Sequence, residues 1–406
     1  MEMLREQAYT MKDLHFWKIV VSLFLASFFI FAALYLVHPL MPIFIEEFDV
    51  SVSYSSLSLS LTVFGMIIGL LVHGYLSDRI GRTVFIKLSL FGSVIPFIVI
   101  PLFNSFIILL IFRFLQGIAL AGLPAAALAY IGEEIDRQGL GLATALYIGS
   151  NALGGMIGRF VTGFIVEQTS WQFTFYLWAG IGIIILLTVM LLLPKSRYFT
   201  PINKPIKEDI TAYFLHLKNP SLILLFIMGI ILQLSFTGMW TYLPLHIVGE
   251  PFYLPLKIIS FLYLAYGFGI VGSSIASMLI ETFPLNIVRF TGIIVLSVGI
   301  FLTLGNTIIL VIIGLCLACL GFFTAHSLTA TKVNLIATHH KGIASSLYLA
   351  AYYVGVSMGS TIFAPVWEWK GWYGVISIGG VLPVVYMVLQ YIFLRKEKKA
   401  CEQVSS

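Results

Sequence analysis

Long apolar stretches, separated by short polar connections, run through almost the whole chain. Each stretch is about 20 residues long, which suits a helix that crosses a bilayer and exceeds what a spanning strand needs. A chain in lipid must also pair its backbone polar groups internally, as a helix does. The pattern predicts an all-α polytopic membrane protein with twelve spans, at 19–42, 54–76, 84–103, 105–131, 140–166, 172–193, 221–245, 257–280, 287–304, 306–331, 342–366 and 372–394.

The composition excludes an ordinary soluble fold. Of the 406 residues, 59% are hydrophobic and only 10% are charged, whereas soluble domains carry about 25% charged residues. The first residues run directly into an apolar stretch without a cleavage pattern, so we expect that stretch to remain as a span. The CxxC of Cys316 and Cys319 lies in an apolar run, which favours helix packing over a redox or metal site. We expect no cofactor and no metal.

The distribution of positive charge predicts the topology. If the N-terminus is cytoplasmic, nearly all of the 23 Lys and Arg residues fall in the cytoplasmic connections and tail. Only Lys257 and Lys370 fall on the opposite side, and Arg289 is placed in a cytoplasmic connection. Both termini are therefore expected to be cytoplasmic in a multi-pass protein of the plasma membrane. The net charge of +5 does not indicate nucleic-acid binding, because the basic residues lie between the spans.

The longest connection, 194–220, divides the chain near its midpoint. Ile206, Ile210, Phe214 and Leu217 share one helical face, which is typical of a short amphipathic helix at the membrane surface. The predicted organisation is a first six-helix bundle at 1–193, this linker at 194–220, and a second bundle with a short basic tail at 221–406.

The two halves are related in sequence. The stretch GLATALYIGSNALGGMIG begins at Gly141, and GIASSLYLAAYYVGVSMG begins at Gly342, with glycine, alanine, leucine and tyrosine at matching positions. Six spans followed by six related spans form a parallel pseudo-repeat. We therefore expect two six-helix bundles around a central cavity.

Three motifs carry a resemblance to a known family. GYLSDRIGR, at 74–82, follows the second span and resembles the signature loop of the major facilitator superfamily. LLIFRFLQGIALAG, with Arg113, Gln116 and Gly117, resembles the fourth-span motif of the proton-coupled exporter branch, and SWQFTF opens the sixth span as is typical there. The resemblance covers the whole chain and implies alternating access of one substrate site between the halves.

The fifth span departs from the drug:proton antiporter pattern. Those exporters usually carry a Gly-Pro pair there, whereas this chain has Gly158 followed by Arg159. The stretches YIGEEI and GGMIGR are more similar to a bacterial exporter-like subgroup, which implies a bacterial cytoplasmic membrane.

The signature loop is predicted to form a conformational latch. A glycine at 81 suits the sharp turn between two helices, and one at 74 would let another helix pack closely. Asp78 would face the positive N-terminus of the eleventh span, near Gly342, while Arg82 would pair with Glu133 or Glu134. The basic residues could instead only fix the topology. The predicted latch residues are Gly74, Asp78, Arg79, Gly81, Arg82, Glu133 and Glu134.

Buried ionisable residues are the candidates for proton coupling. No Asp or Glu lies deep in a predicted span, but Arg113 and Arg159 do. An Arg at the membrane centre costs about 2.5–3.5 kcal/mol on insertion scales, so such residues are functional candidates. Arg113, His38 and His326 are predicted to couple transport to protons, since histidine titrates near neutral pH. Bonding of each Arg to backbone carbonyls, and structural roles for the histidines, are the alternatives.

The resemblance to the major facilitator superfamily implies that spans one and seven line the substrate site. Both carry stripes that mix aromatic and polar side chains, as binding pockets do, although helix packing would also explain the aromatics. With two buried cations and no buried carboxylate, the expected substrate is a neutral or anionic organic molecule. The candidate substrate-binding residues are Phe31, Tyr35, Arg113, Gln116, Asn151, Arg159, Gln233, Thr237, Trp240, Tyr348 and Tyr352.

The sequence thus predicts a secondary active transporter that effluxes a small organic solute with proton coupling and works as a monomer in the bilayer. An importer or facilitator on the same fold is the alternative. No phosphate-binding loop appears, and the spans lack the clustered carboxylates or nucleophile–base pairs of a membrane enzyme. A sensor would usually need a soluble domain, and none fits.

Overall fold

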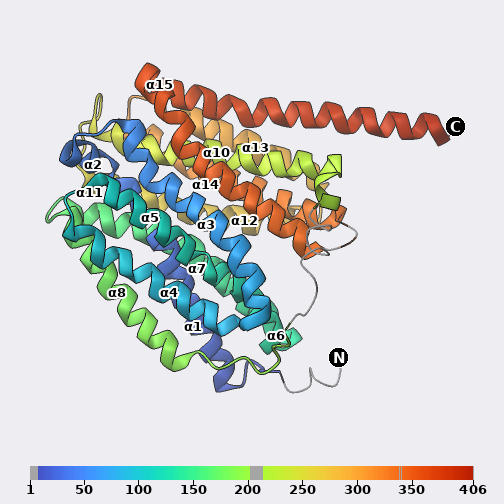
Figure 1. Cartoon of the computed structure of the whole chain (residues 1–406). Helices are drawn as coiled ribbons and strands as arrows, with labels where there is room; N and C mark the ends of the chain where they lie inside the picture. Colours follow the sequence, from blue (N-terminus) through green and yellow to red (C-terminus); the bar gives the residue numbers. More distant parts are fainter. Residues whose placement is uncertain (1–7, 202–213, 338, 340, 406) are drawn as a thin grey trace. The chain divides into compact units, whose positions relative to one another are not determined.

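The computed structural model describes residues 8–201, 214–337, 339 and 341–405, and it shows them as a succession of helices (Figure 1). The only strand-like pairing among these residues is an isolated bridge between Tyr9 and Ile135. Within the described residues, eleven stretches are long and apolar enough to cross a membrane. The last of them, at 342–393, breaks at Gly371, where φ is 57°, so it contains two helices. The predicted twelve-helix, all-α fold is confirmed.

The chain divides into two compact units. The first unit comprises Met1–Lys204 and Leu254–Leu264, and the second unit comprises Pro205–Tyr253 and Ala265–Ser406. The segment 254–264 therefore groups with the first unit, although it follows the seventh span in the chain. Most of the predicted amphipathic linker helix falls on 202–213, outside the described residues.

The first unit is built from helices with identifiable caps. The side chains of Ser51, Asp136 and Ser170 each accept a hydrogen bond from a backbone amide in the first turn of the helix that follows them. Its elements are α1 (Leu14–Tyr35), η2 (His38–Leu40), α2 (Met41–Phe48), α3 (Val52–Ile80), α4 (Arg82–Val99), η3 (Ile100–Leu102), α5 (Phe106–Leu120), α6 (Gly122–Glu134), α7 (Arg137–Val166), α8 (Trp171–Leu192) and α11 (Leu256–Leu262).

The second unit begins its first spanning helix with Asn219, whose side chain accepts from two backbone amides, followed by Pro220 in the first turn. Its helices are α10 (Pro220–Val248), α12 (Gly267–Leu279), α13 (Leu285–Leu302), α14 (Ile308–Ile336) and α15 (Lys341–Ser405), the last broken at Gly371. A 3-10 turn, η4 (Tyr263–Tyr266), precedes α12.

The same helix pairs meet inside each unit. In each unit the first span packs on the fifth, as α1 on α7 and α10 on the part of α15 before Gly371. The second packs on the fourth, as α3 on α5 and α12 on α14. The third packs on the sixth, as α4 on α8 and α13 on the part of α15 after Gly371. The repeat seen in the sequence is therefore a repeat of packing.

Small residues allow the closest of these contacts. A Cβ on Gly117 of α5 would lie 2.8 Å from the carbonyl carbon of Thr62 on α3. A Cβ on Gly158 of α7 would lie 2.6 Å from the Cα of Ala32 on α1. Both helix pairs thus depend on the absence of a side chain. The close α1–α7 contact also sets the distance between His38, which follows α1, and Arg159 on α7.

Candidate functional site

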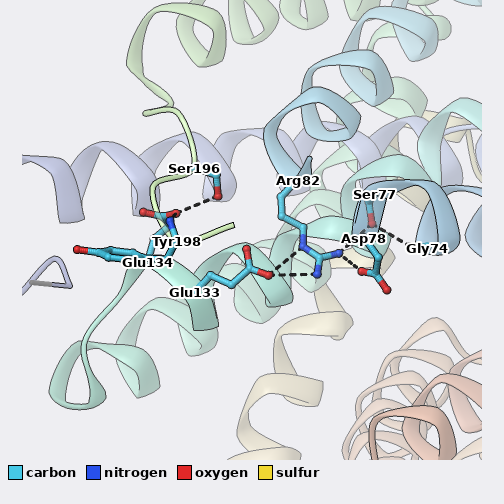
Figure 2. Close-up of polar contacts among 8 residues, drawn as sticks. All are labelled: Gly74, Ser77, Asp78, Arg82, Glu133, Glu134, Ser196 and Tyr198. Carbon is cyan, nitrogen blue, oxygen red and sulfur yellow. Dashed lines mark hydrogen bonds and ion pairs between the residues drawn. The ribbon is translucent and has the colours of Figure 1, made fainter. Parts of the chain in front are cut away.

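The loop predicted as a latch is organised around Arg82, the first residue of α4 (Figure 2). The Arg82 side chain is buried, and its Nε donates to Oε1 of Glu133 over 3.1 Å. Its Nη1 donates to Oγ of Ser77 over 3.1 Å and also pairs with the carboxylate of Asp78. Gly81 joins α3 to α4 at φ 130°, a conformation that favours glycine. Arg82 therefore ties the end of α3 to the end of α6.

Glu134, the other predicted partner of Arg82, binds a different segment of the chain. Its Oε1 accepts from the hydroxyl of Ser196 over 2.9 Å and from the backbone amides of Arg197 and Tyr198 over 2.6 and 3.2 Å. Figure 2 shows its side chain beside this segment rather than beside Arg82. Glu134 thus fastens the chain that follows α8 to the end of α6.

Two other predicted latch residues have surroundings of their own. Arg79 lies over the ring of Tyr75, with 3.6 Å from its Cζ to the ring centroid. The close helix approach expected at Gly74 is wrong within the first unit, because a Cβ there would meet no atom within 4 Å. The approach occurs earlier on α3, where a Cβ on Gly65 or Gly69 would meet the backbone of α5.

Arg113 is fully buried, and its guanidinium is bound by four acceptors. Its Nη1 and Nη2 donate to the carbonyls of Ala33 and Leu34 over 2.9 and 3.0 Å, and its Nε donates to that of Ser58 over 3.2 Å. Its Nη1 also donates to Oε1 of Gln116 over 2.6 Å, and Gln116 in turn donates to a carbonyl of α4. The side chains of the fourth-span motif therefore join α1, α3, α4 and α5.

These carbonyls are available because α1 stops early. The last four carbonyls of a helix lack partners inside it, and α1 ends at Tyr35, before Pro39 in η2. Arg113 caps two of the carbonyls in this last turn. It thereby fixes the end of α1 one turn before His38.

His38 and Arg159 meet inside the first unit. Both side chains are buried, and Nε of Arg159 donates to Nδ1 of His38 over 2.8 Å. Nη1 of Arg159 donates to the carbonyl of Gly155 over 2.7 Å, which anchors the guanidinium to its own helix. Its Cζ lies 4.2 Å from the centroid of the Tyr35 ring and 5.9 Å from that of Tyr263. The sequence assigned His38 to proton coupling and Arg159 to substrate binding, and the structure brings the two side chains into contact.

The other candidates of α1 and α7 lie along the same helix pair. Phe31 is 8% exposed and Tyr35 is 7% exposed, so neither projects into open space within the unit. The amide oxygen of Asn151 accepts from the hydroxyl of Ser27. Asn151 therefore links α7 to α1.

The predicted stripe on α10 is buried in the second unit. Nε2 of Gln233 donates to Oγ1 of Thr237 over 3.0 Å. Oε1 of Gln233 accepts no hydrogen bond from the described residues. The Trp240 ring lies 4.7 Å from that of Tyr266. This stripe keeps a buried polar group next to aromatic rings.

His326 lies next to two other candidates. Its Nδ1 is 2.9 Å from the hydroxyl of Tyr348, and its ring centroid is 4.9 Å from that of Tyr352. The ring of Phe322 is also stacked with that of His326, and their centroids are 5.6 Å apart. His326, Tyr348 and Tyr352 therefore form one cluster between α14 and α15.

The placement of Arg289 in a connection is wrong. Arg289 is the fifth residue of α13 and is fully buried, where its Nη2 donates to Oε1 of Gln390 over 3.0 Å. The predicted span 287–304 includes Arg289, but the charge count assigned this residue to the connection before the span because it lies close to the start of the span. The described residues contain no group of three or more His, Cys, Asp or Glu side chains that could hold a metal.

Comparisons with known proteins agree with this architecture. A family model described as Major Facilitator Superfamily matches residues 23–360. The chain is 34% identical over 379 residues to the uncharacterized MFS-type transporter YybF of Bacillus subtilis (strain 168), covering 93% of each chain. It is 32% identical over 377 residues to the inner membrane transport protein YnfM of Escherichia coli (strain K12), covering 92% of this chain and 90% of that protein.

Among solved structures, a D-xylose–proton symporter is similar in fold, with a TM-score of 0.74 at 15% sequence identity over 92% of this chain and 97% of that one. The family match extends across most of the chain, and two transporters resemble it along nearly their full length. The chain therefore belongs to the major facilitator superfamily, and it is a multi-pass membrane transporter.

Proposed function

We propose that this transporter exports a small neutral or anionic organic solute in exchange for protons. The observation that carries the proposal is the buried contact between His38 and Arg159. The exporter-type motif around Arg113 supports it, because that residue fixes the end of α1 on which His38 depends.

The contact and a proton on Nδ1 of His38 exclude one another. A guanidinium has only donors, so Nδ1 must accept and carries no proton in this arrangement. A proton on that nitrogen would turn the acceptor into a donor. It would also place two cations side by side in a buried site, where repulsion is poorly screened. Protonation of His38 therefore displaces the guanidinium of Arg159.

That displacement would alter a site for solute. Arg159 lies over the Tyr35 ring, and a planar guanidinium beside an aromatic face suits a carboxylate or a polar, conjugated molecule. A solute held by Tyr35 and Arg159 in the unprotonated state loses part of its site when the proton arrives. Proton and solute then compete, which is what exchange transport requires.

A second candidate, proton–anion symport in the import direction, rests on the same contact. A carboxylate that binds Arg159 would draw the guanidinium away from His38 and free Nδ1 for a proton. In that case proton and solute bind together rather than in competition.

The pH dependence of solute binding separates the two. Binding to purified protein is measured between about pH 4 and 8, a range that includes the ordinary histidine pKa and extends well below it. Export by exchange requires weaker binding at acid pH, and symport requires stronger binding. His38→Gln keeps an acceptor for Arg159 but cannot titrate, so its binding should not change over this range. If binding to His38→Gln depends on pH as binding to the wild type does, His38 has no part in the coupling.

The loop around Arg82 is proposed to act in the conformational change. Its network with Asp78 and Glu133 gives the end of α3 a defined geometry inside the first unit. The contact of Asp78 with the eleventh span stays a prediction. Asp78→Asn should retain insertion and folding but lose transport if that contact is needed.

A further inference from the structure

Arg289 is a buried cation that its protein partners satisfy only in part. Its side chain is fully buried, and one of its nitrogens, Nη2, donates to Gln390. Neither Nε nor Nη1 has an acceptor among the described residues. The two ion pairs found in the described part of the chain both lie in the first unit, so no described carboxylate neutralises Arg289.

A second cation, Lys332, is held through Asn286 on the turn of α13 that precedes Arg289. Lys332 on α14 is close enough to interact electrostatically with it, and so are the hydroxyls of Tyr348 and Tyr386 on α15. Nζ of Lys332 donates to Oδ1 of Asn286, at the start of α13, over 2.5 Å. The cluster thus combines two cations, two hydroxyls and two amides, all from the second unit.

Such a cluster is unfavourable unless an anion joins it. A buried donor without an acceptor costs free energy, and a buried charge without a counter-charge costs more. The planar fork of Arg matches the oxygens of a phosphate group, and Lys adds a point charge. We propose that Arg289 and Lys332 bind the phosphate group of an anionic ligand.

The position of the cluster along the helices agrees with this ligand. Arg289 is four residues from the start of α13, and Lys332 is four residues from the end of α14. At about 1.5 Å per residue, each lies about 6 Å from a helix end, near the level of lipid headgroups. Lys332 is half-buried and offers the route of entry. A lipid headgroup and a free phosphate ion share this chemistry.

The site is independent of the proposed function. It lies entirely in the second unit, whereas His38 and Arg159 lie in the first. Loss of proton coupling in a His38 variant would leave this site intact. Conversely, failure of phosphate to bind would leave the coupling proposal untouched.

Thermal unfolding of the purified protein tests the proposal with two probes. Inorganic phosphate is titrated against chloride at equal ionic strength in detergent, and nanodiscs of phosphatidylcholine are compared with nanodiscs that also contain phosphatidylglycerol. The wild type should gain thermal stability from phosphate if the ligand is a free ion, or only from phosphatidylglycerol if it is a lipid. Arg289→Gln should weaken the response about tenfold or more, since charge-assisted hydrogen bonds are lost.

Gln390→Glu provides the sharpest variant. The new carboxylate has the same length as the amide and lies where Oε1 already accepts from Arg289. This carboxylate would supply the missing counter-charge from the protein itself. In the absence of an anion the variant should therefore be more stable than the wild type, and it should not respond to either probe. This result also separates the proposal from a folding failure of Arg289→Gln.

Arg395→Gln is the matched control, because it removes an exposed positive charge five residues beyond Gln390 in α15. It should respond to both probes as the wild type does. No stabilisation of the wild type by either probe would overturn the proposal. So would a Gln390→Glu variant that responds like the wild type, or an Arg395→Gln variant that loses the response equally.

Discussion

Replacing Arg113 with alanine should destabilise the first unit and not only impair transport. The guanidinium donates four hydrogen bonds, three of them to backbone carbonyls of α1 and α3. Because the side chain is fully buried, water cannot readily replace these donors. Two of the carbonyls belong to the last turn of α1, so its end would loosen next to His38.

The size of the effect follows from this count. Four hydrogen bonds to a charged group, at about 1.5–3 kcal/mol each, contribute about 6–12 kcal/mol. Removal of a buried charge from the membrane returns about 3 kcal/mol. The expected net loss in the free energy of unfolding is therefore at least ~3 kcal/mol. Arg113→Lys keeps the charge but not the fork, so it should recover only part of this loss.

Thermal unfolding of detergent-purified variants, followed by tryptophan fluorescence, measures the loss. Leu115→Ala is the control, because Leu115 lies on the same helix and is 48% exposed at the surface of the unit. Arg113→Ala should unfold well below both the wild type and this control. An Arg113→Ala protein as stable as Leu115→Ala would refute the view that Arg113 caps α1.

Three further predictions concern the packing, the loop and the topology. Gly117→Ala should lower the unfolding temperature strongly and Gly74→Ala hardly at all, because only the first Cβ meets the backbone of a neighbouring helix; equal shifts would contradict the packing described above. Asp78→Asn should insert normally yet show little transport in a membrane-vesicle assay, and full activity would exclude the latch. Single cysteines placed at Ser170 and Lys399 should label from opposite sides of the membrane with an impermeant reagent, and labelling from the same side would refute the predicted topology.

The sequence predicted the helices and their repeat well, because apolar length and charge bias are local properties. The twelve spans and their division into two related halves followed from about 20-residue apolar stretches and one internal repeat. The pairing of Arg82 with an acidic residue at the end of α6 was predicted, though not the choice of Glu133. That choice depends on which way each carboxylate points, and hydropathy does not report it.

The contacts of the candidate site were harder to predict. Arg159 and His38 are 121 residues apart, and they meet because α1 ends early and α7 packs closely on it. The predicted span 19–42 runs through Pro39, so neither the end of α1 at Tyr35 nor the contact of His38 with Arg159 was predicted. Arg289 was counted with a connection although it lies two residues inside the predicted span 287–304, because boundaries are the least certain part of a sequence prediction.

The most direct test of the account is solute-driven proton flux in proteoliposomes that contain the wild type or His38→Gln. A pH-sensitive dye outside the vesicles reports the proton flux, while a panel of neutral, anionic and cationic organic solutes is supplied on one side of the membrane. We predict that a neutral or anionic solute drives proton movement in the opposite direction through the wild type, and that His38→Gln still moves the solute without protons. Undiminished proton coupling in His38→Gln would contradict the central claim that the contact between His38 and Arg159 couples the two movements.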